Sequence, residues 1–343
     1  MSLKTELDAI LHHAAIAPLN DRAFLRVTGS DATRWLNGMV TNSVQALAPG
    51  EGCYNFLLNA QGRILGDCTI FRTPDPADPA SFLLEAHSSQ LEAIRQHLDH
   101  FIIMDDVELA PMEQYSHTML LMGPEAPQVL RRMENPTEGC NSFADSAPLR
   151  LHYYPQTATQ LITPAAGLIR RFEISPTFAI DDLLKEARAA GAIEISPEAL
   201  EALRLLEGRP LYGRDITEKY LPQETNQPQA LHFNKGCYLG QEIVERIRSR
   251  GQVHRILTPL TLTGSLPTEF PTPIEAAALS SGEPAKSAGE ITSAALVPLP
   301  EGDRIFALGY VRREALDTHS ALTYSGGSAT PRAASKELLT TNN

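Results

Sequence analysis

The pattern of the chain changes near residue 255, and this change constrains the possible fold more than any other feature. Before it, strand-like and helix-like stretches are intermixed, as where a turn and a short helical pattern follow the strand pattern at 24–27. After it, residues 264–289 are rich in Pro, Ser, Gly and Ala, and the apolar stretches on either side read as strands. We therefore predict an α+β fold with a small all-β barrel at its C-terminal end. The predicted units are a mixed module at 1–252, a barrel at 253–330 and a polar tail at 331–343.

Several helices are expected from local signals. The clearest begins after Ser196, which is a favoured N-cap residue, with Pro197 at the first helical position, and the pattern runs to Gly208. A shorter helix is expected just after Ser30, which would be its N-cap. Helical spacing of apolar residues predicts further helices at 3–11, 89–101, 125–133 and 180–190.

A β-hairpin is expected where two strand-like stretches, 54–58 and 64–71, are joined by the turn Asn59-Ala60-Gln61-Gly62. Gly62 can adopt the positive φ that tight hairpin turns require. The other strands predicted in the module lie at 82–85, 107–110, 115–122, 149–154 and 168–174.

The composition is that of an ordinary globular protein. Of the 343 residues, 43% are apolar and 20% are charged, and there is no apolar run long enough to cross a membrane. The first residues include Lys4, Glu6 and Asp8, which a secretory signal would not contain, so export is not expected. The four cysteines show no close pairing, which favours reduced thiols and a cytoplasmic location. These cysteines are Cys53, Cys68, Cys140 and Cys237.

The charge of the chain bears on its partners. A formal net charge of −12 makes direct binding to nucleic acid unfavourable, because such binding depends on neutralising phosphates. One basic stretch, residues 246–250 with His254 and Arg255, is an exception. It could meet an anionic ligand or be the solvated end of a basic helix, and the sequence leaves both open.

Residues 203–242 hold the densest set of distinctive residues in the chain. Arg204, Glu207, Gly208, Leu211-Tyr212-Gly213 and Asp215-Ile216 together resemble the motif of the T-protein of the glycine cleavage system, the folate-dependent aminomethyltransferase. The later octapeptide resembles the K-G-C-Y-x-G-Q-E signature of the YgfZ-type family, whose mitochondrial relatives act in iron–sulfur cluster assembly. That octapeptide is Lys235-Gly236-Cys237-Tyr238-Leu239-Gly240-Gln241-Glu242.

The resemblance covers nearly the whole chain. Residues 26–31 and 38–42 match the opening of the family, and 289–293 and 308–310 match its terminal barrel. It implies an aminomethyltransferase-like folate-binding module with a C-terminal β-barrel, and tetrahydrofolate as cofactor. It also implies iron–sulfur assembly proteins or client enzymes as partners, with no membrane partner. Any effect on tRNA modification would be indirect, through cluster-dependent enzymes that thiolate tRNA.

The resemblance also assigns the residues that would bind the folate. Glu207 matches the T-protein glutamate that accepts two N–H groups from the pterin edge, a role suited to a carboxylate. Tyr212 would pack against the ligand, and Lys235 would pair with its anionic tail or with an adduct. Gln241 stands where the T-protein has an arginine, and with Arg246 it completes the set. From the residues alone, Glu207 could instead be a solvated acid, Tyr212 a packing residue and Lys235 a surface charge.

Cys237 and Asp67 are the candidates for chemistry. Cys237 comes just before a predicted helix that Gly240 can open, and a thiol near a helix N-terminus and a lysine ionises more readily than a free cysteine. Such a sulfur suits redox or metal chemistry, although a buried structural cysteine is the alternative. Since no second cysteine is near, a complete cluster or zinc site within this chain is not expected.

Asp67 belongs to a segment that resembles a T-protein pattern with two adjacent acids. Here the first of the two positions is Gly66, so one acid remains to manage proton transfer near the folate nitrogens. A classical aminomethyltransferase reaction is therefore not expected, and whether any turnover occurs stays open. The alternatives are a true aminomethyltransferase and a binding scaffold that has lost folate.

Overall fold

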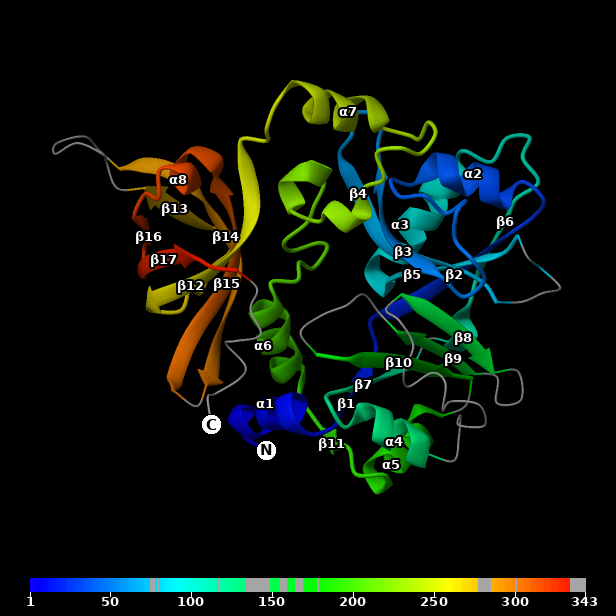
Figure 1. Ribbon diagram of the computed structural model, residues 1–343, viewed down its shortest axis with the longest axis horizontal. Coiled ribbons are helices and arrows are strands. Elements are labelled where there is room, and N and C mark those ends of the chain that lie inside the picture. Colours follow the sequence, from blue (N-terminus) through cyan, green and yellow to red (C-terminus); the bar gives the residue numbers. More distant parts are fainter. Residues whose placement is uncertain are drawn as a thin grey trace.

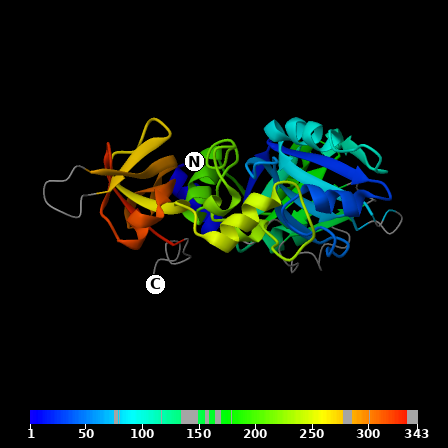
Figure 2. The ribbon, with the colours of Figure 1, turned by 90° about the horizontal axis from the view of Figure 1, so that it is seen from above.

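Two β-sheets and a β-barrel form the framework of the computed structural model, with the sheets at one end and the barrel at the other (Figure 1). Seen from above, helices α6 and α7 lie between these two ends (Figure 2). The structure describes residues 1–74, 78, 80–115, 117–133, 149–154, 159–163, 169–177, 179–276, 285–299 and 301–333.

The five-stranded sheet is antiparallel, in the order β3-β4-β5-β2-β6. The predicted hairpin is confirmed as β3 and β4, and Gly62 in its turn has φ 70°. Apolar residues of α2 and α3, such as Leu36 and Leu98, pack on one face of this sheet. Its elements are β2 (Arg22–Thr28), α2 (Ala32–Met39), β3 (Gly52–Leu58), β4 (Ile64–Arg72), β5 (Phe82–His87), α3 (Ser88–Asp99) and β6 (Glu108–Pro111).

The six-stranded sheet has the order β11-β1-β7-β10-β9-β8, and only the short β11 pairs in parallel among these strands. Helices α4 and α5 pack on one face, and a cluster that includes Phe24 and Ile162 joins the two sheets. Its elements are β1 (Ala15–Leu19), η1 (Glu113–Tyr115), β7 (Thr118–Met122), α4 (Ala126–Arg132), β8 (Arg150–Tyr154), β9 (Thr159–Thr163), β10 (Arg171–Pro176), α5 (Ile180–Ala189) and β11 (Ile193–Glu194).

Helix α6 (Pro197–Glu207) confirms the clearest prediction. The side chain of Ser196 accepts a hydrogen bond from the Ala199 amide, and Gly208 ends the helix with φ 68°. The segment after α6 runs past the barrel and the five-stranded sheet before it enters α7 (Figure 1). The remaining elements outside the barrel are α1 (Leu3–His12), η3 (Pro222–Thr225), η4 (Pro228–Ala230) and α7 (Gln241–Arg250).

The barrel is closed, with strand order β12-β15-β14-β13-β16-β17, so the predicted C-terminal β-barrel is present. The boundaries given for the three units stay predictions, and residues 334–343 of the expected tail lie outside the described ranges. Its elements are β12 (Arg255–Gly264), β13 (Thr272–Ala276), β14 (Lys286–Leu299), β15 (Gly302–Arg312), α8 (Arg313–Asp317), β16 (Leu322–Tyr324) and β17 (Gly327–Pro331).

Asp215 fastens the barrel to the module. This fully buried carboxylate accepts hydrogen bonds from Arg204 at 2.6 Å, and from Thr292 at 2.5 Å and Ser293 at 2.6 Å on β14. The Tyr310 hydroxyl of β15 also donates to its backbone carbonyl at 2.9 Å. Two residues of the T-protein-like motif, Arg204 and Asp215, therefore hold the structure together.

The start of α2 differs from the prediction. Its N-cap is Asp31, not Ser30, and the hydroxyl of Ser30 donates instead to the carboxylate of Asp106 at 2.8 Å. Ser30 precedes the N-cap by one residue, and its hydroxyl bonds to the loop of Asp106 instead of accepting from an amide of the first helical turn.

Among the described helices, none combines the length and the apolar character needed to cross a lipid bilayer.

Candidate functional site

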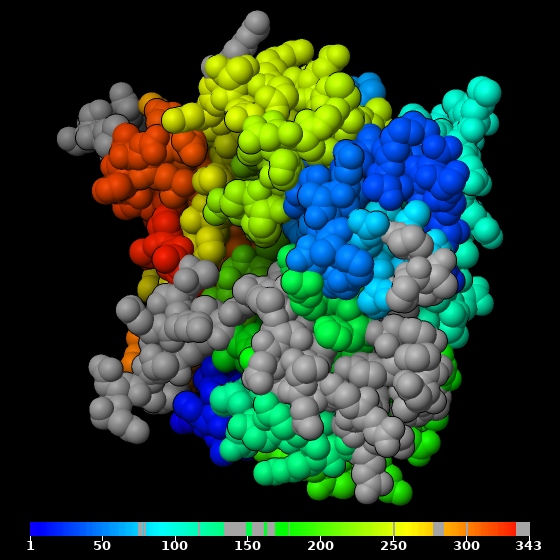
Figure 3. All heavy atoms as spheres, turned by 45° about the vertical axis from the view of Figure 1, so that its right-hand side comes forward, coloured from blue at the N-terminus to red at the C-terminus, as the bar shows by residue number. Residues whose placement is uncertain are grey.

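Lys235 fastens the Cys237 segment to the C-terminal end of α2. Its ammonium donates to the backbone carbonyls of Asn37 at 2.6 Å, Val40 at 2.7 Å and Asn42 at 2.6 Å. A cation at this position satisfies carbonyls that the end of a helix leaves without partners. The two stretches that carried the family resemblance, 38–42 and 235–242, thus lie against each other. In the space-filling view the yellow part of the chain, which includes the Cys237 segment, lies at the top of the molecule beside the blue N-terminal part (Figure 3).

The charge of Lys235 is engaged inside the protein. Burial lowers the pKa of its ammonium to about 8, whereas the three carbonyl acceptors favour the charged form. The alternative of a surface charge is wrong, and the ammonium points at backbone oxygens. The predicted pairing of Lys235 with a folate tail stays a prediction that has to compete with these three bonds.

Cys237 is exposed, unlike the other two cysteines within the described ranges. Burial raises the pKa of Cys53 to about 11 and that of Cys68 well above its usual value. The preceding Gly236 also lies in open space, because a Cβ placed on it would meet no atom within 4 Å. The alternative of a buried packing cysteine is therefore wrong. Cys140 lies outside the described residues.

The helix after Cys237 begins as predicted. Gly240 is the N-cap of α7 with φ 80°, and a side chain there would come within 2.5 Å of the Asn59 carbonyl oxygen. The side-chain oxygen of Gln241 accepts a hydrogen bond from the Tyr238 amide at 3.2 Å. Arg246 is exposed on α7. The folate contacts of Gln241 and Arg246 stay predictions.

Asp67 belongs to a second cluster, on the β3–β4 hairpin. Its carboxylate accepts hydrogen bonds from the Tyr54 hydroxyl at 2.5 Å and the Gln90 amide at 3.0 Å. Burial and then the charge of Asp67 raise the pKa of Tyr54 well above its usual value, so this phenol keeps its proton. The hydroxyl of Tyr212 donates to the Leu65 carbonyl at 2.6 Å, and burial raises its pKa to about 12. The cluster can hold a proton but is already internally bonded.

Gly66, the position of the missing acid, lies against α3. A Cβ on Gly66 would lie 3.1 Å from a side-chain carbon of Ile94 and 3.2 Å from the side-chain oxygen of Gln90. The amide group of the same Gln90 donates to the Asp67 carboxylate at 3.0 Å, so an acid at 66 would lie beside a partner of Asp67. The interpretation that the missing acid weakens proton transfer stays a prediction.

Glu207 lies in a buried ion network. Its carboxylate pairs with Arg171 and with Arg209, the latter at 2.7 Å. Burial alone would raise the pKa of Glu207, but the charges of Arg209 and Arg171 outweigh it and lower the pKa. The Nε atom of Arg171 has no hydrogen-bond partner within the part of the chain that the structure describes. The alternative of a solvated acid is wrong.

The network continues to the two sheets. The Arg22 guanidinium lies 3.2 Å from Glu85 on β5 and 3.3 Å from Glu173 on β10. Burial and the nearby Glu173 raise the pKa of Glu85 well above its usual value. For Glu173, burial is outweighed by Arg22, which lowers its pKa. The opposite shifts favour a proton on Glu85 over one on Glu173.

These residues were missed at the sequence level, together with Tyr54. The hairpin register could have indicated Tyr54, because Phe56 pairs with Asp67 and places Tyr54 diagonally across from it. Arg171 and Glu173 alternate with apolar residues and look like the solvent side of a strand, yet both are buried. Only the packing of the second sheet against the first reveals the network.

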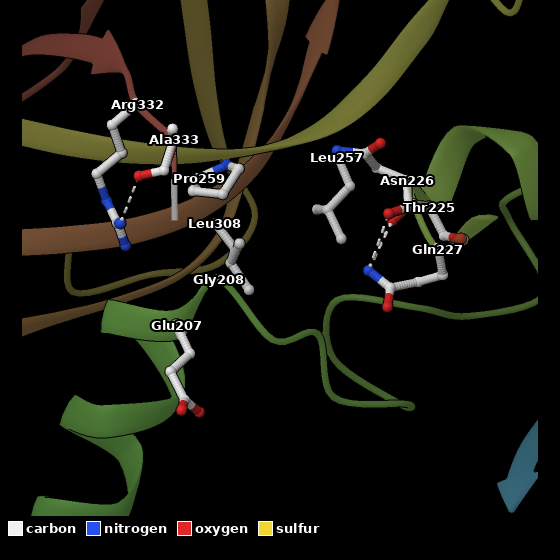
Figure 4. Close-up of a pocket in the computed structure, with 10 residues that line it drawn as sticks. All are labelled: Glu207, Gly208, Thr225, Asn226, Gln227, Leu257, Pro259, Leu308, Arg332 and Ala333. Carbon is white, nitrogen blue, oxygen red and sulfur yellow. Dashed lines mark hydrogen bonds between the residues drawn. The ribbon is translucent and has the colours of Figure 1, made fainter. Parts of the chain in front are cut away.

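Two cavities lie where the barrel meets the module. One, of about 250 Å³, contains Glu207 and Gly208 in its wall, with the Glu207 carboxylate directed away from the barrel strands (Figure 4). The other, of about 420 Å³, includes His254 and Arg255 of the basic stretch. Arg255 is paired with Glu224 at 3.0 Å, so part of this stretch serves internal contacts.

The predicted folate residues have separate partners. Glu207 pairs with arginines, Tyr212 with the Leu65 carbonyl and Lys235 with carbonyls of α2 and the residues after it. Their convergence on one ligand stays a prediction. Within the described ranges, His, Cys, Asp and Glu side chains form no group of three that could hold a metal ion.

The family whose model matches this chain is the GCVT N-terminal domain, over residues 1–159. A mouse protein named iron-sulfur cluster assembly factor IBA57, mitochondrial, is 29% identical over 272 residues, which are 74% of this chain and 68% of the mouse protein. An Arabidopsis thaliana protein named as a putative chloroplastic transferase is 24% identical over 92% of this chain and 69% of its own length. An Aspergillus clavatus IBA57 homologue is 28% identical over 74% of this chain, which spans 58% of that relative.

A solved structure confirms the fold class. The aminomethyltransferase T of the glycine cleavage system from Bartonella henselae aligns with a TM-score of 0.79, covering 97% of this chain and 88% of that one at 19% identity. The chain thus has an aminomethyltransferase-like fold with a closed C-terminal barrel. The comparisons do not single out the YgfZ-type family within this superfamily.

The predicted cytoplasmic location is wrong by the same comparisons. The IBA57 relatives are named as mitochondrial and the Arabidopsis relative as chloroplastic, which points to an organellar location. The prediction rested on the unpaired cysteines and on the charged residues Lys4, Glu6 and Asp8, which argue against export. Both suit any reducing compartment, so they could not separate the cytoplasm from an organelle.

Proposed function

We propose that this chain, on its aminomethyltransferase-like fold, is a tetrahydrofolate-binding accessory factor for the assembly or repair of iron–sulfur proteins. The observation that carries the proposal is the exposed Cys237 on a segment that Lys235 holds in place. The relatives named as iron-sulfur cluster assembly factors support the same role. Any effect on tRNA modification would be indirect, through enzymes that depend on such clusters.

Among the cysteines that the structure describes, one thiol is exposed, and this defines what the partners must provide. Thiolates are the usual ligands of iron–sulfur clusters, and a complete cluster needs several of them. Cys53 and Cys68 are buried, so Cys237 would contribute one sulfur while a partner protein contributes the others. The proposed partners are therefore proteins that carry or receive a cluster.

Folate binding is supported by the fold and by the chemistry of Glu207. A buried, ionised carboxylate can accept two N–H groups from a pterin edge. Arg209 holds the same carboxylate with a side chain that is 46% exposed, so its guanidinium can turn towards solvent while Arg171 stays. The pterin would then take the place of Arg209.

Titration with tetrahydrofolate tests this part of the proposal. Glu207→Gln should weaken binding roughly tenfold or more, since a charge-assisted hydrogen-bonded pair is lost. Glu201→Gln on the same helix is the matched control, because Glu201 pairs with Arg204 and Arg214 and not with the two arginines that hold Glu207. Unchanged affinity in a folded Glu207→Gln protein would remove Glu207 from the site. If the unaltered chain bound no tetrahydrofolate, the alternative of a binding scaffold that has lost folate would hold.

The second candidate is an aminomethyltransferase, which Asp67 favours because it is retained and hydrogen-bonded to Tyr54. A glycine-cleavage assay with lipoyl carrier protein separates the two functions. We expect no turnover, because both oxygens of Asp67 are occupied by internal donors. Turnover at the level of a T-protein would reverse this assignment.

A further inference from the structure

Two neighbouring apolar side chains protrude from the loop between α3 and β6. Ile103 is 84% exposed and Met104 is 95% exposed. Phe101 and Ile102 precede them and pack against the core of the five-stranded sheet, and the Trp35 indole donates to the Phe101 carbonyl at 3.2 Å. Two adjacent apolar side chains that are almost fully exposed lose unfavourable contact with water when a partner covers them. The exposed pair therefore needs a functional explanation.

The loop is held in a fixed shape against the start of α2. Arg34 pairs with Asp105 at 2.5 Å, and the Asp106 amide donates to the Asp31 carboxylate at 3.0 Å. The backbone amide and hydroxyl of Ser30 donate to the Asp106 carboxylate at 3.1 and 2.8 Å. A loop that is already ordered loses little conformational entropy when a partner binds, so it presents the two apolar side chains ready for contact.

Acidic residues follow the exposed pair in the chain. Asp105, Asp106 and Glu108 come within four residues of it, and Arg34 neutralises Asp105. Hydrogen bonds from Ser30 lower the pKa of Asp106, so Asp106 and Glu108 are the acids that give this rim its negative charge. Phospholipid surfaces are commonly anionic and would repel this rim. A second copy of the chain would bring like charges together, and its net charge of −12 adds to the repulsion. The electrostatics favour a protein partner with basic groups around an apolar pocket.

Helix α2 connects this loop to Cys237. Its N-terminal end carries the Asp31 contact, and at its C-terminal end the Gly38 carbonyl accepts from the Leu239 amide at 3.0 Å. A helix of eight residues is about 12 Å long. A typical interface buries about 800 Å² on each partner and is roughly 30 Å across, which is enough to cover both ends of α2.

We propose that Ile103 and Met104 are the apolar anchor by which a partner protein docks, and that docking places this partner against Cys237. The partner presents an apolar pocket with a basic rim. The inference rests on the proposed function, because the docked protein is the one that supplies or receives the cluster.

The test replaces both side chains, Ile103→Ser with Met104→Ser, in the full chain. In cells that lack the native protein, the activity of a cluster-dependent enzyme should fall roughly tenfold or more, the loss expected when an interface anchor is removed. The melting temperature and the tetrahydrofolate affinity should stay unchanged, because neither side chain is part of the core. Leu296→Ser is the matched control, since Leu296 is 45% exposed on the barrel and should be silent.

The outcomes separate this inference from the proposed function. Full enzyme activity with the double variant, while Cys237→Ser is inactive, overturns the docking surface and leaves the function in place. The opposite result, an active Cys237→Ser and an inactive double variant, overturns the thiol's role and leaves the docking surface. Two further results would overturn the choice of a partner protein. If the unaltered protein floated with phosphatidylserine vesicles and the double variant did not, the surface would bind a membrane. If the unaltered protein formed a dimer in sedimentation equilibrium and the double variant did not, the surface would bind a second copy of the chain.

Discussion

The Glu207 network and the Cys237 segment both come from the stretch that carried the family resemblance, yet they are built in opposite ways. Glu207 is buried between Arg171 of β10 and Arg209, which follows α6. Cys237 is exposed, and the lysine two residues before it points inward to three carbonyls. In the first region the charged groups stabilise one another. In the second, the ammonium of Lys235 holds the backbone, and the side chain of Cys237 stays exposed.

This difference gives each region a separate experimental signature. Substitutions in the buried network should act first on stability, because an unpaired buried charge is costly. Substitutions at the exposed end should act on function with little change in stability. The largest expected stability effect is therefore at the network, and the smallest is at Cys237.

Arg171→Met should destabilise the protein most. It leaves the Glu207 carboxylate with the half-exposed Arg209, and losing one partner of a buried pair costs on the order of 3–5 kcal/mol. Urea unfolding measures the change. Arg209→Met is the control and should cost less than about 1 kcal/mol, since pairs with an exposed partner contribute little. Equal losses of unfolding free energy in the two variants would contradict the larger stabilising role of Arg171.

Lys235→Met should cost about 2 kcal/mol, because the carbonyls of Asn37, Val40 and Asn42 lose a charged donor. The segment should also loosen, so the Leu239 amide should exchange with solvent deuterium faster. Lys219→Met, which removes an exposed ion pair with Glu290, should cost less than about 1 kcal/mol. Unaltered exchange at Leu239 would contradict the role of Lys235 as the fastening residue.

Glu85→Gln should have a smaller effect that depends on pH. The pKa of Glu85 is raised in the folded state, so its protonated form contributes stability below the unfolded pKa, and this contribution is lost as pH rises through the folded pKa. Glutamine mimics the protonated acid and cannot ionise. At pH 8 the variant should be as stable as the native protein or more stable by about 1 kcal/mol, and its stability should fall less between pH 5 and pH 8. A variant that lost stability at pH 8 would show that ionised Glu85 is required.

The sequence anticipated most local structure but not the buried polar contacts. Caps and turns made α6 and the β3–β4 hairpin predictable, because Ser196, Gly208 and Gly62 act through neighbouring residues. Strand β1 was missed, because its residues are buried on both faces and so lack the alternation of a surface strand. The partners of Lys235 lie about 200 residues away in the chain, and no local pattern could supply them.

The candidate site was predicted by residue identity and not by geometry. The motif matches singled out Glu207 and Cys237 from the sequence. The structure adds that Glu207 is buried and that Cys237 is exposed. For Lys235 the residue type suggested an anion, whereas packing directs the ammonium to carbonyl oxygens. From the sequence alone, a lysine two residues before a cysteine is equally compatible with binding an anion and with donating to backbone carbonyls. Only the position of α2 separates these two arrangements.

The central claim, that Cys237 is left exposed in order to act, is tested most directly with Cys237→Ser. The substitution is nearly isosteric at an exposed position, so the melting temperature and the tetrahydrofolate affinity should not change. The activity of a cluster-dependent enzyme in cells that lack the native protein should be lost, while Cys53→Ser and Cys68→Ser should lower stability and retain that activity in the folded fraction. Full enzyme activity with Cys237→Ser would contradict the account and leave this cysteine without a functional role.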